Sequence, residues 1–593
     1  MRRLLLSNVV AALVWTGTAC AAEPLDYVPA DTAYVLANVD RMPLALSEKM
    51  VGMYPAGIYA EILDGVLLAD AEQAKEAKAA ASQAEAAGEN SDAEAETEAE
   101  AETEAEAEAE AAEKPASKPM SPATRRVLEA LADEFRGKAN MLDVMRSWGT
   151  RSDAKYALYG VGVIPVFRLE LGDRAKFEAF VGRLEQAYGD SIKKEQGKRG
   201  TTWRFGDEKA ELVVGTLDQQ LFMTMLPLKA DAKFRATMLE PAKTPMGARG
   251  LASFNRSKGF TGHGGGYIDI VKLAGVFTGK LGPNERALFA ALDEKPPSAT
   301  PQCQADFLTM AQNFPRIIMG TTQVTNKAFN LNAVVEMKPE LAKELTALSA
   351  GSASAGASMF TFGMAIDPMK AVDFLKAQSD KVAAKPYVCP DLLDMNASFA
   401  SMRESLNTAP TAMLAGFKGF SFALHDIKLD AKTKRPSSMT GTLALTSDAP
   451  MMLLGLAQAT LPQLAGLSIQ PDGKSVALAA EAMPEMIGPT FVSMGDKFLA
   501  LANGKDAQVR LAKVAATPIA SSGPFMSASI TGGFYGLMAD LMVMASPEKD
   551  SEKRLVEASA EIYRTMQNSL SKAEVKVNFT PKGVEMIQLM EMK

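Results

Sequence analysis

The chain has 593 residues, a formal net charge of −8 and 47% hydrophobic residues, which is enough apolar side chain for more than one folded core. Its 63 Lys and Arg residues are scattered rather than striped with aromatic residues, which disfavours a nucleic-acid partner. Only two histidines and three cysteines are present, and no His, Cys or carboxylate cluster has metal-ligand spacing. We therefore expect no metal, no cofactor and no catalytic residues.

The N-terminus predicts a signal peptide over residues 1–22. Met1-Arg-Arg3 is a charged start, Leu4 to Trp15 is an apolar run, and small residues follow. The run is too short to span a bilayer, and it predicts export to the periplasm or cell envelope. Two outcomes stay open: cleavage near Ala21 or Ala22, or retention of Cys20 as a lipidated lipoprotein cysteine. Lipid on Cys20 is the only membrane contact that we expect.

An acidic tract interrupts the first third of the chain. From Glu85 to Glu113 there are 13 acidic residues and no Lys or Arg, and without them the net charge would be +5. These charges repel one another and cannot bury apolar area, so we predict a disordered insert over 71–120. The tract is interpreted as an expanded linker between two helices, with weak cation capture or contact with a basic partner as the alternative.

Five sequence blocks occur twice in the same order. The strand over 31–40 ends in Asp40 followed by a Met/Pro pair, and the strand over 358–367 ends in Asp367 followed by a Pro/Met pair. Each later block of the first part also has a counterpart: 167–184 with 443–461, 221–235 with 498–510, 266–273 with 525–537, and the helix and hairpin 307–337 with 555–583. Similarity within one block is weak and is typical of convergent strand-helix patterning, so the series carries the prediction.

We therefore predict a tandem duplication. One domain-sized copy covers 27–345 and the second covers 357–593, joined by a linker over 346–356 that is rich in Ser, Ala and Gly. Strands are interleaved with helices, and several strands are joined by short turns. The expected fold class is α+β, with each copy a largely antiparallel sheet that has helices packed on one face.

Cys303 and Cys389 are the cysteines that remain once Cys20 is removed or lipidated. An even pair in an oxidising compartment predicts one disulfide, which would tie the first copy to the second. The alternative is two separate buried thiols. A Cα separation beyond about 7 Å would eliminate the bridge.

The histidines offer little catalytic signal. His263-Gly-Gly-Gly266 has the form of a lipase oxyanion loop, but no Gly-X-Ser-X-Gly elbow follows it. His425 lies in an alternating segment that is typical of a partly exposed strand. The 34 methionines mostly lie among Leu, Ile and Phe, where they are expected to fill a core. Copper(I) binding is one alternative for them, and an adaptable apolar groove for lipid or peptide is another.

The opening strand also carries a resemblance. Tyr27-Val-Pro-Ala-Asp31-Thr-Ala-Tyr34 resembles the start of an uncharacterised family of exported bacterial proteins, whose members open with a similar Pro-Ala-Asp-Thr strand. Those proteins continue with strand-helix units that end in a helix and hairpin like Phe307–Met337. The family has no established activity, so the resemblance implies no site residues, and the acidic insert is a departure from it.

From these features we expect a non-enzymatic, exported cell-envelope protein that acts as a protein-interaction or structural module. One alternative is a lipid or hydrophobic-ligand binding protein with a groove between sheet and helices, which a large apolar cavity would favour. Another alternative is a hydrolase, which would need a buried Ser, Asp or Glu beside His263 or His425.

Overall fold

The computed structural model describes residues 22–88, 120–189, 192–206, 209–408, 415–430, 432–433, 435–460, 464–479, 487–545 and 550–593. The predicted signal peptide up to residue 21, including Cys20, lies outside the described residues. Residues 89–119, which hold most of the acidic insert, also lie outside them. The α+β class is confirmed, because helices and strands are interleaved along the chain and the strands form a large antiparallel sheet.

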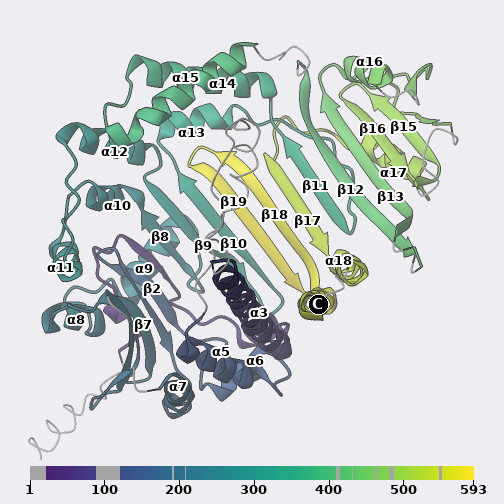
Figure 1. The fold of residues 1–593 in the computed structure, drawn as a ribbon. Coiled ribbons are helices and arrows are strands. Elements are labelled where there is room, and N and C mark those ends of the chain that lie inside the picture. Colours follow the sequence, from purple (N-terminus) through teal and green to yellow (C-terminus); the bar gives the residue numbers. More distant parts are fainter. Residues whose placement is uncertain are drawn as a thin grey trace, which may run out of the picture.

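Nineteen strands form this sheet (Figure 1). Those of the first half are β1 (Tyr34–Ala37), β2 (Tyr156–Val161), β3 (Ile164–Glu170), β4 (Lys193–Gln196), β5 (Thr201–Gly206), β6 (Ala210–Leu217), β7 (Gln220–Pro227), β8 (Gly265–Asp269), β9 (Arg316–Val324) and β10 (Ala328–Glu336). Those of the second half are β11 (Phe360–Ala365), β12 (Phe417–Asp430), β13 (Arg435–Ser447), β14 (Ser475–Ala477), β15 (Thr490–Gly495), β16 (Phe498–Asn503), β17 (Met526–Thr531), β18 (Leu570–Thr580) and β19 (Gly583–Met592).

The strands follow one unbroken order, and every neighbouring pair is antiparallel. The first half runs β4-β5-β6-β7-β3-β2-β1-β8-β9-β10. The second half runs β14-β15-β16-β13-β12-β11-β17-β18-β19. Apart from the extra strand β4, the two halves therefore have the same pairing order.

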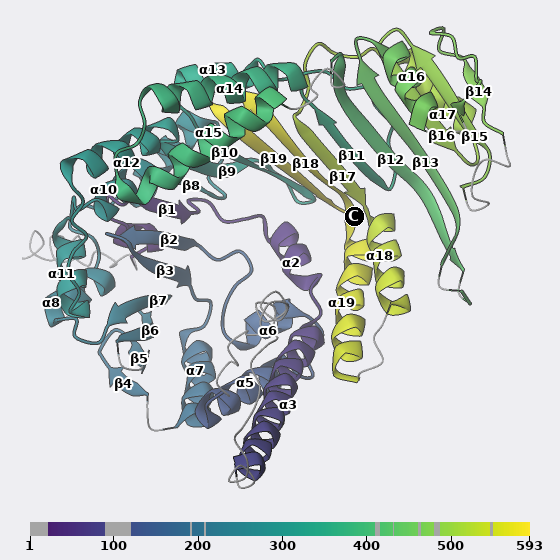
Figure 2. The same ribbon diagram turned by 45° about the horizontal axis from the view of Figure 1, so that its top comes forward.

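The halves meet through the last strand of each. β10 pairs with β19 over its whole length, from Ala328 opposite Glu591 to Glu336 opposite Gly583. Backbone hydrogen bonds thus continue from one half into the other, so the predicted copies share one sheet. In Figure 2 this sheet bends into an open arch.

Helices cover both faces of the sheet, whereas the sequence analysis expected them on one face of each copy. Those of the first half are η1 (Pro24–Tyr27), α2 (Leu44–Gly52), α3 (Ala56–Gly88), α5 (Pro122–Phe135), α6 (Met141–Ser147), α7 (Arg174–Tyr188), α8 (Ala232–Leu239), α9 (Gly247–Lys258), α10 (Ile270–Phe277), α11 (Pro283–Leu292), α12 (Pro301–Asn313) and α13 (Pro339–Thr346). Helices α8 and α9 bury Phe234, Met238 and Leu251 on the outer face, while α7 buries Phe177, Phe180 and Val181 on the inner face.

The second half repeats this two-sided covering. Its helices are α14 (Pro368–Ala384), η2 (Pro390–Leu392), α15 (Leu393–Thr408), α16 (Pro450–Thr460), α17 (Ala507–Ala516), α18 (Gly532–Met544) and α19 (Asp550–Ser569). Leu511 of α17 packs against Ala444, Ala500 and Ala502 on one face, while Leu454 of α16 packs against Leu499 on the other. Helices α2, α6, α18 and α19 lie inside the arch, and α12 to α15 lie along its outer side (Figure 2).

The segment expected to be a linker, 346–356, is packed against the second half. Ala353 is buried, its N–H donates to Thr446 Oγ1 at 2.7 Å, and its carbonyl accepts from Ser421 Oγ at 2.6 Å. A Cβ on Gly351 would lie 1.7 Å from the Ala520 carbonyl oxygen, so only glycine fits there. The small residues of this segment serve close packing rather than freedom of movement.

The acidic insert leaves and re-enters the fold at one place. Helix α3 continues to Gly88, so the first part of the predicted disordered region 71–120 is helical. Asp70 on α3 accepts from the Met120 N–H at 2.7 Å and pairs with Arg125 of α5. The two ends of the insert therefore lie side by side, which explains why an expansion at this point leaves the sheet intact.

Among the described residues no single helix is long and apolar enough to cross a membrane. One bent pair, Leu44–Gly52 with Ala56–Glu72, passes by length and composition alone. Leu46, Ala56 and Ala60 of this pair are buried within the protein.

Candidate functional site

A row of apolar residues crosses almost the whole sheet on its inner face. Residues directly opposite each other on paired strands point to the same face, so the register defines the row. It runs through every strand except β4 and β14: Trp203, Val214, Met223, Phe167, Leu158, Leu36, Gly266, Met319, Ala333, Met586, Val577, Met526, Met364, Phe420, Leu445, Leu499 and Met494. We call this row the apolar stripe.

The stripe is buried at its two ends and partly exposed along its length. Trp203 and Met494 are fully buried, beneath α7 at one end and beside α16 at the other. Between them Met223, Leu158 and Met586 keep 37, 38 and 39% of their surface exposed. Gly266 is buried, and the other stripe residues between Met223 and Leu445 are half-buried. The inner face therefore presents a contiguous apolar surface rather than single exposed side chains.

The outer face of the same strands is packed differently. The residues adjacent to the stripe residues point outwards and are buried: Val35, Ala157, Val166, Ile318, Val334, Ala365 and Ala444. On these strands the outer face is apolar, whereas at the junction of the halves the outward neighbours include the half-buried residues Asn332, Glu585, Lys576 and Ser527.

Beneath α7 the stripe passes through a cleft. Its volume is about 540 Å³, within the usual range for ligand sites. The sheet supplies Leu169, Phe205, Leu212, Val214, Leu221 and Met223, and the helices supply Val127, Met145, Trp148, Phe177, Phe180, Val181, Leu184 and Tyr188. Only Thr150 and the Tyr188 hydroxyl are polar among the lining side chains. A hydrocarbon chain would meet no unpaired charge in this cleft.

The polar atoms around the cleft are already satisfied by one another. The Trp148 ring N–H donates to Glu134 at 3.1 Å, and that carboxylate also pairs with Arg183. The Trp203 ring N–H donates to Glu185 at 3.0 Å. Burial raises the pKa of Glu185, but hydrogen bonds from Lys194 and Trp203 outweigh it and leave this pKa below its usual value. These hydrogen bonds fix both indole rings, of which Trp148 lines the cleft and Trp203 is buried beside it.

Neither histidine lines this cleft. His263 Nδ1 lies 2.8 Å from the Arg41 carbonyl oxygen, so this nitrogen carries the proton and donates it. His425 Nε2 lies 3.1 Å from the buried Thr442 hydroxyl, which also accepts from Arg510 Nε at 3.1 Å. In the described part of the chain, no carboxylate or serine hydroxyl is hydrogen-bonded to either imidazole ring.

The glycine run after His263 has a packing explanation. A Cβ on Gly266 would lie 1.8 Å from the Val35 carbonyl oxygen, and a Cβ on Gly265 would lie 2.6 Å from Asn255 Oδ1. Both glycines allow β8 to approach its neighbours closely. The run forms part of a strand pairing, which accounts for it without an oxyanion hole.

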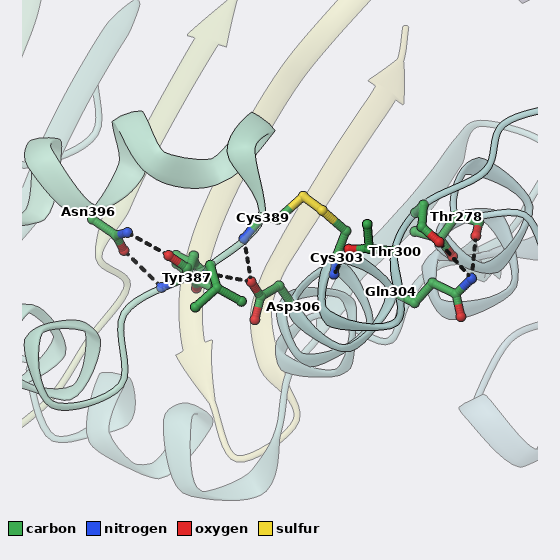
Figure 3. Close-up of a disulfide and its surroundings, with 10 residues drawn as sticks. Thr278, Thr300, Cys303, Gln304, Asp306, Tyr387, Cys389 and Asn396 are labelled. Carbon is green, nitrogen blue, oxygen red and sulfur yellow. Dashed lines mark hydrogen bonds between the residues drawn. A yellow bond between two sulfur atoms is a disulfide. The ribbon is translucent and has the colours of Figure 1, made fainter.

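Cys303 and Cys389 form the predicted disulfide, with their Cα atoms 4.5 Å apart (Figure 3). The bond joins α12 of the first half to the chain just before η2 of the second half. Asp306 lies beside it and accepts from the N–H groups of Val388 and Cys389 at 2.8 and 3.0 Å. The bridge therefore ties the halves together at a second place, away from the β10–β19 pair.

No group of three or more His, Cys, Asp or Glu residues could hold a metal ion in the part of the chain that the structure describes. Comparisons with protein-family models, curated proteins and solved structures return no match. The resemblance to the exported family with the Pro-Ala-Asp-Thr strand thus stays a prediction.

Sequence reasoning placed methionines in a core or, alternatively, in an adaptable groove, and it did not find the stripe. Met223, Met586, Met526, Met364 and Met319 all lie on it. The signal was present in strands whose two faces are both apolar, such as 317–319 and 333–335. Without the strand register, these residues could not be assigned to one continuous row.

Proposed function

We propose that this chain is an exported, non-enzymatic protein that binds a molecule with a hydrocarbon chain along the apolar stripe. The cleft beneath α7 is the part of the stripe where that chain would be bound. The observation that carries this proposal is the pairing of an apolar-lined cleft of about 540 Å³ with a partly exposed apolar surface that continues from it across the sheet.

Energetics support a ligand on this surface. Burying apolar area gains about 25 cal/mol per Å², so a contiguous exposed row leaves unused a large free energy that a bound chain would recover. Soluble proteins rarely expose large contiguous apolar patches unless these patches bind something. Flexible methionines suit a site that accepts chains of more than one length or degree of unsaturation.

We also infer a tandem duplication as the origin of this architecture. The same strand order recurs in the two halves, and the five sequence blocks follow that order. Because β10 and β19 are equivalent in this order and pair antiparallel, an approximate twofold axis at their junction relates the halves. Such a duplication would double the length of the inner face.

A protein partner is the second candidate, because the exposed stripe would also accept an apolar helix or strand. A bound protein would co-purify as a second polypeptide, whereas a bound hydrocarbon chain would appear in the organic extract. The experiment is native purification from the cell envelope, followed by mass spectrometry of both the organic extract and the polypeptides. We expect lipid in near-stoichiometric amount and no second polypeptide.

Binding is then measured with a fluorescent fatty acid on the delipidated protein. Met223→Glu places a charge in the cleft wall and should weaken binding by roughly tenfold or more, since an unpaired charge is costly in apolar surroundings. The matched control is Met452→Glu on α16, a methionine outside the stripe that is 41% exposed, against 37% for Met223. A protein that releases no lipid and binds the probe equally well with and without the Met223 substitution would contradict the proposal.

A further inference from the structure

A second cleft lies on the outer side of the first half, between the β2–β3 turn, α10 and the start of α11. Its volume is about 480 Å³. Unlike the cleft beneath α7, it carries charges of both signs: the carboxylates of Asp31 and Glu285, and the ammonium groups of Lys272 and Lys280. No ion pair within 4.0 Å joins any of these four described residues to one another.

Glu285 is the residue in this cleft whose side chain could accept hydrogen bonds from a ligand. It is only 8% exposed, yet among the residues described its carboxylate makes no hydrogen bond and no salt bridge. The neighbouring floor hydroxyl is satisfied, because Thr32 Oγ1 donates to the Gly160 carbonyl at 2.8 Å and accepts from the Gly160 N–H at 3.2 Å. The Glu285 carboxylate oxygens are not among the fully enclosed unpaired atoms of the described residues, so they reach the cleft, where a ligand or water can supply the missing donors.

Two glycines make room for this carboxylate. A Cβ on Gly162 would lie 2.5 Å from Glu285 Oε1, and a Cβ on Gly282 would lie 2.5 Å from Glu285 Oε2. Gly162 also has a φ of +62°, which side-chain-bearing residues rarely adopt. The backbone on both sides is thus shaped to hold the carboxylate at the floor of the cleft.

Neither lysine at the rim forms a salt bridge with an acidic residue in the part of the chain that the structure describes. Lys272 Nζ donates only to the backbone carbonyls of Asp31 and Thr32, at 3.3 and 3.5 Å. Lys280 is exposed and lines the same cleft. Two carboxylates and two ammonium groups make the cleft neutral overall, which favours a ligand with both charges over a simple anion or cation.

We propose that this cleft binds a small zwitterion, whose ammonium group donates to Glu285 while its anionic group meets Lys272 and Lys280. A soluble zwitterion with one ammonium and one anionic group shares this chemistry with the ethanolamine phosphate headgroup of a lipid. The site is separate from the apolar stripe, and its test does not depend on the proposed hydrocarbon binding.

Isothermal titration calorimetry of the full chain with O-phosphoethanolamine tests the proposal. Ethanolamine and inorganic phosphate, each with one of the two charges, should bind more weakly than the zwitterion. Glu285→Gln should weaken binding of O-phosphoethanolamine by roughly tenfold or more, the usual effect of losing a charge-assisted hydrogen bond. Glu294→Gln, an exposed carboxylate just beyond α11, is the matched control and should leave the affinity unchanged.

Flotation with phosphatidylethanolamine vesicles, compared with phosphatidylcholine vesicles, distinguishes the two sources of the zwitterion. Capture by the first type alone, lost in Glu285→Gln, identifies a lipid headgroup; soluble binding without capture identifies a free compound. Absence of binding to O-phosphoethanolamine, or equal binding by wild type and Glu285→Gln with an unchanged melting temperature, would overturn the proposal. Met223→Glu should leave this binding intact, which separates it from the stripe.

Discussion

The two halves share a strand order but treat the end of the inner face in opposite ways. In the first half, α7 packs on Trp203 and Leu221 but leaves a cleft lined by Leu212 and Met223. In the second half, the equivalent strands β15 and β16 are covered by α16 and by the segment after it, which buries Leu464, Ile469 and Leu478 against Leu499 and Met494. One half keeps room for a ligand where the other fills the space with its own chain.

This difference indicates that the architecture does not itself create the site. The site depends on the segment after one strand: α7 with its aromatic residues in the first half, and α16 with a folded-back stretch of chain in the second. The cleft of the proposed ligand thus belongs to one half, while the other half extends the apolar surface and completes the sheet.

The largest expected effect concerns the bond that holds the unlike halves together. Replacing both Cys303 and Cys389 by Ala should lower the free energy of unfolding by about 4 kcal/mol, because the bridge closes a loop of 86 residues in the unfolded chain. Chemical denaturation with and without reductant measures this loss. If the β10–β19 pairing alone stabilised the contact between the halves, the denaturation midpoint would not change on reduction of the disulfide.

A matched pair of strand leucines tests the contrast between open and filled ends directly. Leu499→Ala in the filled half should cost about 2–5 kcal/mol, because Leu499 is only 6% exposed and its removal leaves a cavity. Leu212→Ala in the cleft wall should cost less than about 1 kcal/mol, because Leu212 is already 37% exposed. Equal shifts in the denaturation midpoint would remove the distinction between the two ends.

The smallest expected effect is a pH dependence specific to the second half. Burial, and then the nearby Arg510 charge, lower the pKa of His425. The unfolded chain therefore binds a proton at His425 more readily than the folded chain, so stability should fall as the pH drops through about 6.5. His425→Gln should reduce this acid sensitivity by less than about 1 kcal/mol between pH 7 and 5, measured as the difference between the two denaturation midpoints. If the pH dependence of stability were the same in His425→Gln as in the wild type, other titratable groups would be responsible for it.

Much of the architecture was readable from local patterns in the sequence. The alternation in 329–337 and the turn 580–583 predicted the hairpin strands, and the two cysteines predicted their own bond. The insert was expected between two helices and lies between α3 and α5, but its predicted start at residue 71 falls within α3, which continues to Gly88.

The long-range features could not be predicted in this way. Nothing in β10 or β19 specifies which strand pairs with its outer edge, so the single sheet was missed. The small residues of 346–356 are typical of a flexible linker and of tight packing alike, and only the contacts of Ala353 and Gly351 decide between these interpretations. Glu285 is one of many glutamates in the sequence, and its burial depends on two glycines that are distant from each other in the chain.

The β10–β19 junction also affects the tendency of this chain to aggregate. Unpaired strand edges recruit other chains, and long edges do so most readily. By pairing the last strands of the two halves, the molecule conceals its longest edges and leaves only β4 and β14 at the ends of the sheet, with four and three residues. The same junction that lengthens the apolar face thereby removes the two edges along which further copies of the chain could polymerise.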